Sequence, residues 1–270
     1  MANSKQKNTW FLKVGLILTV FMVAVILIGQ FWTPYDPNQM SGSEKMQGPS
    51  IHHIFGTDNF GRDIFSRVVQ GAGATFMIAF ATVAIGLVVG ILIGLFTGYF
   101  GGWLDEILMR INDSIMAFPS ILLALVLIAI LCGGKYNIII ALGILFIPSF
   151  ARLVRSEVAR QKSMDYVKNA KLMGVGTMRL LFVHILPNIV PVLLSAIAIG
   201  FNNAVLAEAS MSFLGVGVQP PDPSLGRMLN EAQTYLMSAP WYAMSTGIAI
   251  VLLVLGFGLL GEGLGGERNG

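Results

Sequence analysis

The chain has 270 residues, of which 55% are hydrophobic and 11% are charged, and its mean hydropathy is +0.74. In a soluble domain roughly a quarter of all residues are charged. The composition therefore excludes an ordinary soluble protein and predicts a chain embedded in a lipid bilayer. The net charge of +3 requires no nucleic acid as a partner, because membrane proteins commonly carry an excess of Lys and Arg on their inner side.

Six long windows without Asp, Glu, Lys or Arg divide the chain. A helix needs about 20 apolar residues to cross the hydrocarbon, and these windows are continuous rather than alternating, which excludes the strands of a membrane barrel. The sequence therefore predicts an all-α integral membrane protein with six transmembrane helices. We expect these helices at residues 14–31, 74–99, 114–132, 137–150, 189–212 and 241–260.

The positive residues predict the orientation of the chain. Lys and Arg resist translocation when they lie in short loops near the ends of spans, and most of the 17 Lys and Arg residues fall on one side if the N-terminus is cytoplasmic. We therefore expect both the N- and C-termini in the cytoplasm. Residues 1–13 then form an N-terminal tail, residues 14–262 one transmembrane domain, and residues 263–270 a C-terminal tail.

The outer loop after the first window contains two features that carry predictions. Turns at Gly56 and Gly61 precede apolar residues mixed with charges at 64–68, which is the pattern of a short helix at the membrane surface. His52 and His53 invite a metal site, but adjacent histidines lack the i,i+4 spacing of a helical metal pair and no third ligand is evident. We expect these histidines in a solvated loop, and we expect no metal site.

The second window carries Gly86, Gly90, Gly94 and Gly98, one glycine every four residues. Small residues at this spacing let two membrane helices approach closely. We therefore expect a packing seam along this face, with another subunit as one candidate for the partner of the seam.

A basic, polar insert at residues 152–188 separates the fourth window from the fifth and is the best indication of function. Ser163 or Asp165 can cap a helix by accepting hydrogen bonds from its free amides, and Gly174 is placed to end that helix. Thr177 can cap the next one. The insert therefore predicts a helix, a glycine break and a second helix at the cytoplasmic end of the bundle.

The first helix of the insert is predicted to be amphipathic. Tyr166, Ala170 and Met173 recur at the three-to-four spacing that makes one apolar stripe, while Lys168 and Asn169 point elsewhere. Such a helix fits a groove on a soluble partner protein. The alternative is an interfacial helix that rests on anionic lipid.

Three polar residues of the fifth predicted helix, Asn202, Asn203 and Glu208, lie toward the outer half of the membrane. Polar groups at membrane depth are costly unless they face the bundle interior or water. These residues either line a path for a substrate or make structural hydrogen bonds to a neighbouring helix. The windows contain no Gly-x-Ser-x-Gly and no His-Glu-x-x-His, so the sequence does not predict an intramembrane enzyme.

The insert resembles the signature of the membrane subunits of bacterial ABC importers: Glu-Ala-Ala, three residues, Gly, nine residues, Ile, one residue, Leu-Pro. Ala170, Gly174, Leu186 and Pro187 keep that spacing, whereas the signature's glutamate, first alanine and isoleucine are replaced by Lys168, Asn169 and His184. Further segments resemble the dipeptide, oligopeptide and nickel importer permeases, and within them the second, C-type permease of each system. These segments are residues 56–67, 98–105, 108–110, 117–125, 151–155 and 212–224.

This resemblance implies a type I ABC importer permease fold in the bacterial cytoplasmic (inner) membrane. It implies four kinds of partner: a homologous B-type permease that completes a heterodimer, two ATP-binding subunits on the cytoplasmic side, an external substrate-binding protein, and membrane lipid. The insert at 152–188 would be the coupling insert. Within it, the residues near the docking surface of the ATPase would be Asp165, Tyr166, Ala170 and Gly174.

The cargo implied by the resemblance is a peptide-sized solute, either a di- or oligopeptide or nickel or a metal chelate. Residues 133–136 lack the first glycine and the hydroxyl of a phosphate-binding loop, so the chain is expected to be non-catalytic and without a cofactor, with ATP and Mg bound by the partner subunits. The alternative is a channel or a secondary transporter that works without ATP. In such a protein the insert has no evident purpose.

Overall fold

The computed structural model describes the backbone of residues 2–266 and the side chains of residues 10–265. Apart from one isolated β-bridge, the regular structure of these residues is helical. Five of the described helices are long and apolar enough to cross a membrane, and a bent pair of helices makes the number six if the pair is counted as one span. The predicted fold class, an all-α membrane protein, is confirmed.

The five long helices are α1 (Ala2–Phe31), α2 (Ile64–Phe100), α5 (Lys135–Lys162), the continuous segment Thr177–Phe213 and α10 (Pro240–Gly266). The segment Thr177–Phe213 is made of α7 (Thr177–Arg179), a π-helical turn η1 (Leu180–Ile185) and α8 (Leu186–Phe213). The shorter helices are α3 (Gly102–Met116), α4 (Ser120–Ile130), α6 (Asp165–Leu172) and α9 (Leu225–Gln233). Residues 152–162 of the predicted insert are thus the last turns of α5.

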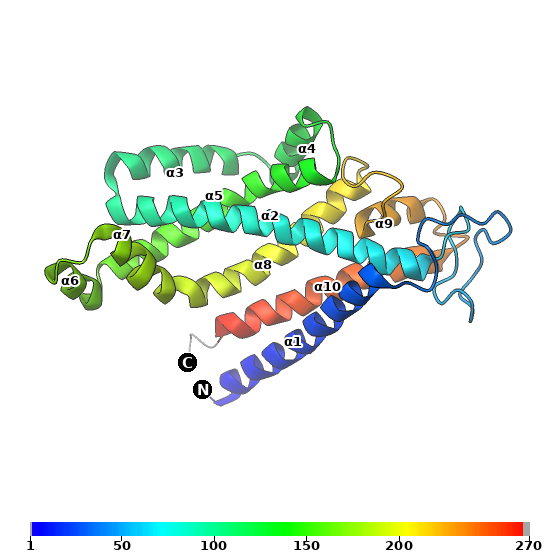
Figure 1. Cartoon of the computed structure of the whole chain (residues 1–270), viewed down its shortest axis with the longest axis horizontal. Helices are drawn as coiled ribbons and strands as arrows, with labels where there is room; N and C mark the ends of the chain where they lie inside the picture. Colours follow the sequence, from blue (N-terminus) through cyan, green and yellow to red (C-terminus); the bar gives the residue numbers. More distant parts are fainter. Residues whose placement is uncertain (1, 267–270) are drawn as a thin grey trace.

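The two ends of the bundle differ in what they carry (Figure 1). The short helices α6 and α7 lie at one end, and the loop between α1 and α2 lies at the other, beside α9. Helices α1 and α10 run side by side, and a Cβ added at Gly263 near the end of α10 would lie 2.7 Å from the Cβ of Leu12 in the first half of α1. The start of α1 and the end of α10 therefore lie together.

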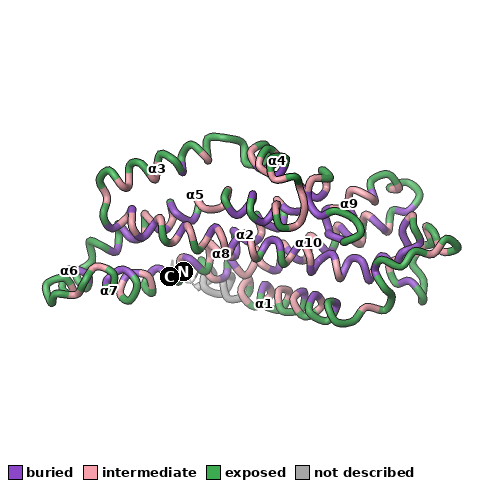
Figure 2. Tube along the Cα trace, turned by 45° about the horizontal axis from the view of Figure 1, so that its top comes forward, coloured by how far each residue is buried: buried purple, intermediate pink, exposed green. Residues whose placement is uncertain are grey.

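Burial follows the central helices of the bundle (Figure 2). The buried residues concentrate on α2, α5, α8 and α10, whereas α3 buries a single described residue, Asn112. Helix α3 is attached to the bundle from outside by an ion pair between Asp105 and Arg155 of α5, with 2.6 Å between Oδ2 and Nη2. Helix α3 therefore contributes little to the buried core of the bundle.

The third predicted span, residues 114–132, is not one straight helix. It is divided between α3 and α4, which meet at an angle of 93°. Pro119 at the break has no backbone N–H, and a proline disfavours the helical conformation of the residue before it, here Phe118. The prediction was wrong in this respect because apolar composition marks membrane depth and does not report where the backbone bends.

The predicted surface helix at residues 64–68 is also wrong, because these residues are the first turns of α2. Asp63 caps the helix: its Oδ2 accepts hydrogen bonds from the Ser66 amide at 2.8 Å and the Ser66 hydroxyl at 2.7 Å. The charge of Arg67, which suggested an exposed surface, lies inside the protein at 1% exposure. Its partners come from elements far away along the chain.

The predicted glycine seam of α2 is confirmed, and its partner is α5 of the same chain rather than another subunit. A Cβ added at Gly86 would lie 2.7 Å from the Cβ of Phe146, and one added at Gly94 would lie 2.5 Å from the Cβ of Val154. Such distances leave no room for a side chain. The missing side chains therefore let the α2 and α5 backbones approach closely.

Candidate functional site

Helix α6 ends as the sequence predicts. Gly174 has a φ of +79°, which glycine adopts at little cost. The amide of Val175 donates to the Ala170 carbonyl at 3.1 Å, and the amide of Gly174 donates to the Lys171 carbonyl at 3.0 Å. These two bonds form a Schellman motif, which satisfies the last carbonyls of the helix. The turn after α6 is thus fixed by its backbone.

The beginning of α6 differs from the prediction. The N-cap residue is Met164, and no side chain of the described residues caps the helix there. The Ser163 hydroxyl instead donates to the Arg160 carbonyl at 2.8 Å, while Asp165, already inside the helix, pairs with Lys168 at 3.1 Å. Thr177 likewise does not cap the next helix, because Gly176 occupies the cap position. The first turn of α6 therefore follows the end of α5 without a side-chain cap of its own.

The buried stripe of α6 consists of Val167 and Ala170, which pack against Leu180, Leu181 and Ile185 of η1. The predicted stripe of Tyr166, Ala170 and Met173 is therefore wrong except at Ala170. Met173 follows the last helical residue, so the helical spacing no longer applies to it.

Tyr166 lies beside the buried stripe, where its hydroxyl donates to Gln161 Oε1 at 2.9 Å. Partial burial raises the pKa of this hydroxyl, so it remains a neutral hydrogen-bond donor. Tyr166 therefore braces α6 against the end of α5 while its ring edge stays at the surface.

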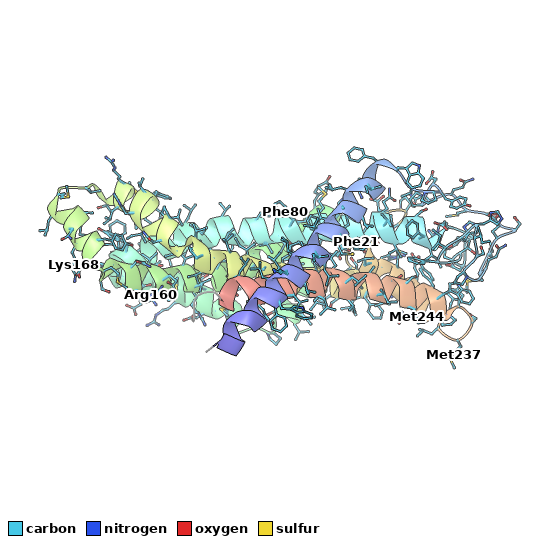
Figure 3. All side chains as sticks on the ribbon, turned by 90° about the horizontal axis from the view of Figure 1, so that it is seen from below. Phe21, Phe80, Arg160, Lys168, Met237 and Met244 are labelled. Carbon is cyan, nitrogen blue, oxygen red and sulfur yellow. The ribbon has the colours of Figure 1, made fainter. Side chains whose placement is uncertain are left out.

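Two exposed apolar residues at the end of α6 were not predicted as site residues. Leu172 is 86% exposed and Met173 is 85% exposed. With Gly174 they form a surface that we call the tip patch, at the end of the bundle where Figure 3 labels Lys168. A signal existed in the sequence, since these are adjacent apolar residues directly before the glycine that ends a polar helix. Adjacent apolar side chains exposed at the end of a bundle indicate a surface that contacts a protein or a membrane.

Helix α6 is tied to the end of α2 through Tyr99, a buried residue. The Lys171 Nζ of α6 lies 4.8 Å from the centroid of the Tyr99 ring, which is within the range of a cation–π interaction. The Lys162 Nζ donates to the Tyr99 carbonyl at 2.6 Å, and a cation is favourable at the C-terminal end of a helix. Tyr99 at the end of α2 thus contacts both α6, through Lys171, and the end of α5, through Lys162.

The three predicted path residues of α8 do not share one surface. Glu208 is fully buried, and its Oε1 accepts a hydrogen bond from the Ser212 hydroxyl at 2.6 Å. Asn202 faces α10, where it lies against Gly258. Asn203 lines a cavity. The structure therefore places one of the three residues at an open space and two inside the packing of the chain.

The cavity has a volume of about 260 Å³ and lies between α4, α5 and α8. Ser120 of α4, Ser149 of α5 and Asn203 of α8 contribute polar groups to its wall. Its apolar wall includes Leu145, Phe146 and Met211. The cavity therefore offers polar groups from three helices within an otherwise apolar region.

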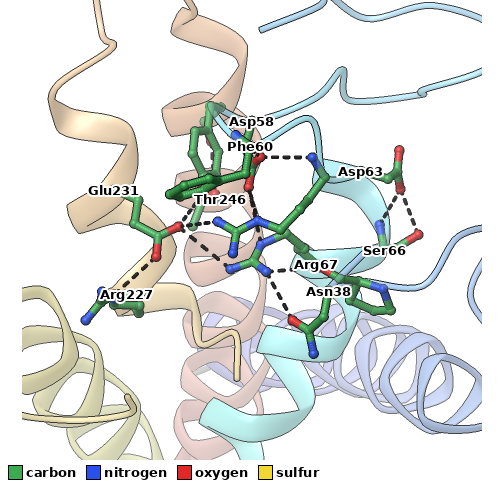
Figure 4. Close-up of polar contacts among 12 residues, drawn as sticks. Asn38, Asp58, Phe60, Asp63, Ser66, Arg67, Arg227, Glu231 and Thr246 are labelled. Atoms are coloured by element: carbon green, nitrogen blue, oxygen red, sulfur yellow. Dashed lines mark hydrogen bonds and ion pairs between the residues drawn. The ribbon is translucent and has the colours of Figure 1, made fainter. Parts of the chain in front are cut away.

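The opposite end of the molecule contains a network of ion pairs (Figure 4). The Arg62 Nε lies 2.6 Å from Asp58 Oδ2, and the Arg62 Nη2 lies 3.1 Å from Glu231 Oε2 of α9. Arg67 lies between the same two carboxylates, at 3.7 Å from each, and donates to the Pro37 carbonyl at 3.0 Å. We call residues 33–63 together with α9 the outer cap, after the orientation predicted from the sequence. The network holds the outer cap to the start of α2.

His53 belongs to the outer cap and is buried, so the predicted solvated loop is wrong for this histidine. Its Nδ1 lies 2.9 Å from Oδ1 of Asp63, the residue that caps α2. His52 beside it is exposed, as predicted. His53 is therefore a structural partner of the helix cap.

Comparison with known proteins assigns this arrangement to a family. Residues 90–265 match the model of the binding-protein-dependent transport system inner membrane component. The chain is 40% identical to a dipeptide transport system permease protein of Alkalihalophilus pseudofirmus over 252 residues, which are 93% of this chain and 83% of that protein. It is 45% identical to a glutathione transport system permease protein of Salmonella paratyphi A over 255 residues, which are 93% of this chain and 84% of that protein.

Proposed function

Because this chain belongs to the family of binding-protein-dependent transport system inner membrane components, we propose that it moves a peptide-sized solute across the membrane with energy supplied by partner subunits. It is a C-type permease of an ABC importer and a multi-pass protein of the bacterial inner membrane. The proposed assembly contains a homologous B-type permease, two ATP-binding subunits that hold ATP and Mg, and an external substrate-binding protein.

The observation that carries the proposal is the tip patch on α6. Leu172 and Met173 are exposed beside a turn that the backbone of Gly174 fixes. The rest of the exposed face of α6 carries one residue of each charge, Asp165 and Lys168. A pair of apolar anchors within a charged face suits a groove on a protein better than a lipid surface. We therefore propose α6 as the coupling helix that docks on an ATP-binding subunit.

The contacts of α6 supply a route from the ATPase to the membrane helices. Val167 packs on η1, which is continuous with α8, and Lys171 contacts Tyr99 at the end of α2. A displacement of α6 then moves α8 and α2 together, which would switch the bundle between outward-open and inward-open states. ATP and the loaded binding protein give direction if each binds one of those states more tightly.

The replacement of the usual glutamate by Lys168 is compatible with this docking. The Lys168 Nζ pairs with Asp165 of the same helix at 3.1 Å, and both side chains are largely exposed. An exposed pair of this kind contributes about 0–1 kcal/mol. In this chain the docking of α6 is therefore proposed to rest on the apolar anchors rather than on a charge at position 168.

The proposed cargo is a short peptide. Two relatives carry names that specify a dipeptide and glutathione, and both names describe compounds built from a few amino acids. Nickel or a metal chelate is the second candidate for the cargo. The proposed path through the membrane passes Asn203, which faces the cavity. For Asn202 and Glu208, which lie inside the packing of the chain, a role in the path stays a prediction from the sequence.

The test is reconstitution of the complete importer in proteoliposomes with its ATP-binding subunits and its external binding protein. We expect uptake of a radiolabelled dipeptide to require all subunits and ATP, and to stop with vanadate. Uptake that continues without ATP hydrolysis would establish a channel or a secondary transporter instead. Uptake of nickel without dipeptide uptake would retain the importer and change the cargo.

A further inference from the structure

We propose that Ser120, Ser149 and Asn203 form a contact site for the peptide groups of the cargo in the cavity between α4, α5 and α8. This inference rests on the proposed function and identifies which part of the bundle and which chemical groups meet the cargo. Ser120 and Ser149 were not predicted from the sequence. Asn203 was predicted as a path residue without a partner or a surface.

The first step is that these three side chains lack hydrogen bonds within the described residues 10–265. Other hydroxyl groups on the same kind of helix bond to their own backbone. The Ser210 hydroxyl donates to the Leu206 carbonyl at 2.7 Å, and the Ser114 hydroxyl donates to the Arg110 carbonyl at 2.8 Å. Ser120 and Ser149 make no such bond and face the cavity instead.

The second step is the depth of the cavity in the membrane. Ser120, Ser149 and Asn203 each lie in a window free of Asp, Glu, Lys and Arg, bounded by residues 113 and 135, 135 and 152, and 179 and 208. A polar group without a partner at such depth is costly, unless it faces water or a polar ligand. Ser120, Ser149 and Asn203 are each exposed at the open side of the cavity. Three such groups from three helices therefore favour water or cargo over lipid at this surface.

The break between α3 and α4 gives an independent indication. Ser120 is the first residue of α4, directly after the 93° bend. Irregular backbone at membrane depth is tolerated where it is buried in protein or lines a water-filled cavity, and not against lipid. The side chain of Phe118 at the break is exposed, so the irregular backbone is not buried within this chain. Of the two tolerated situations, the wall of a water-filled path therefore fits the break.

The chemistry of the site matches a peptide group. A carboxamide and a hydroxyl each donate and accept hydrogen bonds, as a peptide group does, and the residues that line the cavity include no charged side chain. The apolar wall at Leu145 and Phe146 can accept side chains of different kinds. Contacts of this type recognise the backbone of the cargo and leave its side chains free to vary.

The size of the cavity supports contact with one segment of the cargo. Its volume of about 260 Å³ is below the range of about 300–1,000 Å³ that sites for whole small ligands occupy. The chain therefore forms one wall of the path, and the cargo passes over it in an extended form.

The chain offers a clean test by cysteine labelling, because its single cysteine is Cys132. In a Cys132→Ser background, Ser120→Cys, Ser149→Cys and Asn203→Cys are compared with Ile17→Cys on α1, a position 68% exposed on the outside of the bundle. The assembled importer in proteoliposomes is treated with a charged, membrane-impermeant thiol reagent. We expect the three cavity positions to react several-fold faster than position 17, and dialanine delivered by the binding protein to slow their reaction.

A second measurement addresses recognition of the backbone. Asn203→Leu and Ser149→Ala are expected to slow dialanine uptake about fivefold each, since one hydrogen bond contributes about 1 kcal/mol. The control Ser210→Ala, whose hydroxyl bonds to its own helix, is expected to transport normally. ATP hydrolysis should persist in all three variants. Uptake of a lysine-containing dipeptide should fall by the same factor as uptake of dialanine.

The outcomes separate this inference from the proposed function. If ATP-driven dipeptide uptake occurs but the three cysteines react no faster than Cys at position 17, the contact site is wrong and the importer stands. Equal uptake by the Ser149→Ala and Ser210→Ala variants, or a loss confined to one dipeptide, also contradicts the contact site. If uptake does not require ATP hydrolysis in the unmodified protein, the proposed function itself fails.

Discussion

The outer cap and the tip patch use charged and apolar residues in opposite ways. In the outer cap, Arg67 is 1% exposed and lies between two carboxylates of its own chain. At the tip patch the apolar Leu172 is 86% exposed, and the nearby pair of Asp165 and Lys168 lies in solvent. The charges of the outer cap are therefore paired within the chain, whereas the apolar side chains of the tip patch are left exposed for the partner that we propose.

This difference indicates how the two ends work. A buried ion pair is costly to break because the remaining charge has no solvent to stabilise it. An exposed ion pair contributes little to stability, so α6 is held mainly by the packing of Val167 and Ala170, by the hydrogen bond of Tyr166 to Gln161 and by the contact of Lys171 with Tyr99. The end that carries the outer cap is consequently held by buried ion pairs, whereas α6 at the opposite end is the element that we propose an ATP-binding subunit moves.

The largest effect is expected in the outer cap. Asp58→Asn removes the charge that pairs with Arg62 and Arg67, and breaking a buried pair costs about 3–5 kcal/mol. Thermal unfolding of the purified importer in detergent should show a large drop in Tm. Asp165→Asn at the tip is the matched control and should leave the Tm almost unchanged. Equal drops for both variants would contradict the difference between the two ends.

The next effect is expected at the tip patch. Leu172→Glu places a charge where an apolar anchor is proposed to enter the ATPase, and burial of a leucine contributes about 1.5–3 kcal/mol. Co-purification of the ATP-binding subunits with the permease should fall about tenfold or more, with a similar loss of uptake. Met237→Glu at the opposite end, where Met237 is 100% exposed and labelled in Figure 3, should retain the subunits. Retention of the subunits by the Leu172→Glu variant would count against docking at α6.

A smaller effect is expected from the backbone at the end of α6. Gly174 has a φ of +79° and nothing within 4 Å of an added Cβ, so Gly174→Val acts through the backbone alone, at a cost of about 1–2 kcal/mol. The protein should insert in the membrane while ATP hydrolysis becomes uncoupled from uptake. Gly176 also has open space around an added Cβ but has a φ of −65°, so Gly176→Val should remain coupled. Comparable uncoupling by both variants would refute the role of the positive φ.

The sequence predicted those features that depend on neighbouring residues or on composition. Windows without charge located the membrane helices, and the spacing of Gly86 to Gly98 located the seam with α5. Gly174 was recognisable because a glycine that ends a helix satisfies carbonyls only a few residues away. These are local or periodic signals, and they are read without knowledge of the rest of the fold.

The features that were missed depend on partners distant in the sequence. Arg62 pairs with Glu231, which is 169 residues away, so the charges around it suggested a surface helix. His53 was expected in solvent because Asp63 becomes its neighbour only when the loop folds back on the start of α2. The cavity residues Ser120 and Ser149 come from different helices. Each serine alone is an ordinary polar residue in a membrane helix, and the site exists only in their juxtaposition.

The smallest effect is expected where α6 contacts the end of α2. Lys171→Met keeps most of the side chain but removes the cation that lies 4.8 Å from the Tyr99 ring, an interaction of about 0.5–1 kcal/mol. Uptake per ATP hydrolysed should fall about twofold to fivefold while the ATP-binding subunits remain bound. Lys168→Met, on the same helix but paired with Asp165 alone in the described chain, should leave this ratio unchanged. Tyr99→Leu removes this interaction together with the contact of the Lys162 Nζ, which lies 5.5 Å from the same ring. It should therefore lower the ratio at least as much as Lys171→Met, and adding Lys171→Met to Tyr99→Leu should cause no further loss. An additive loss in the double variant would mean that α6 moves α2 by some other contact.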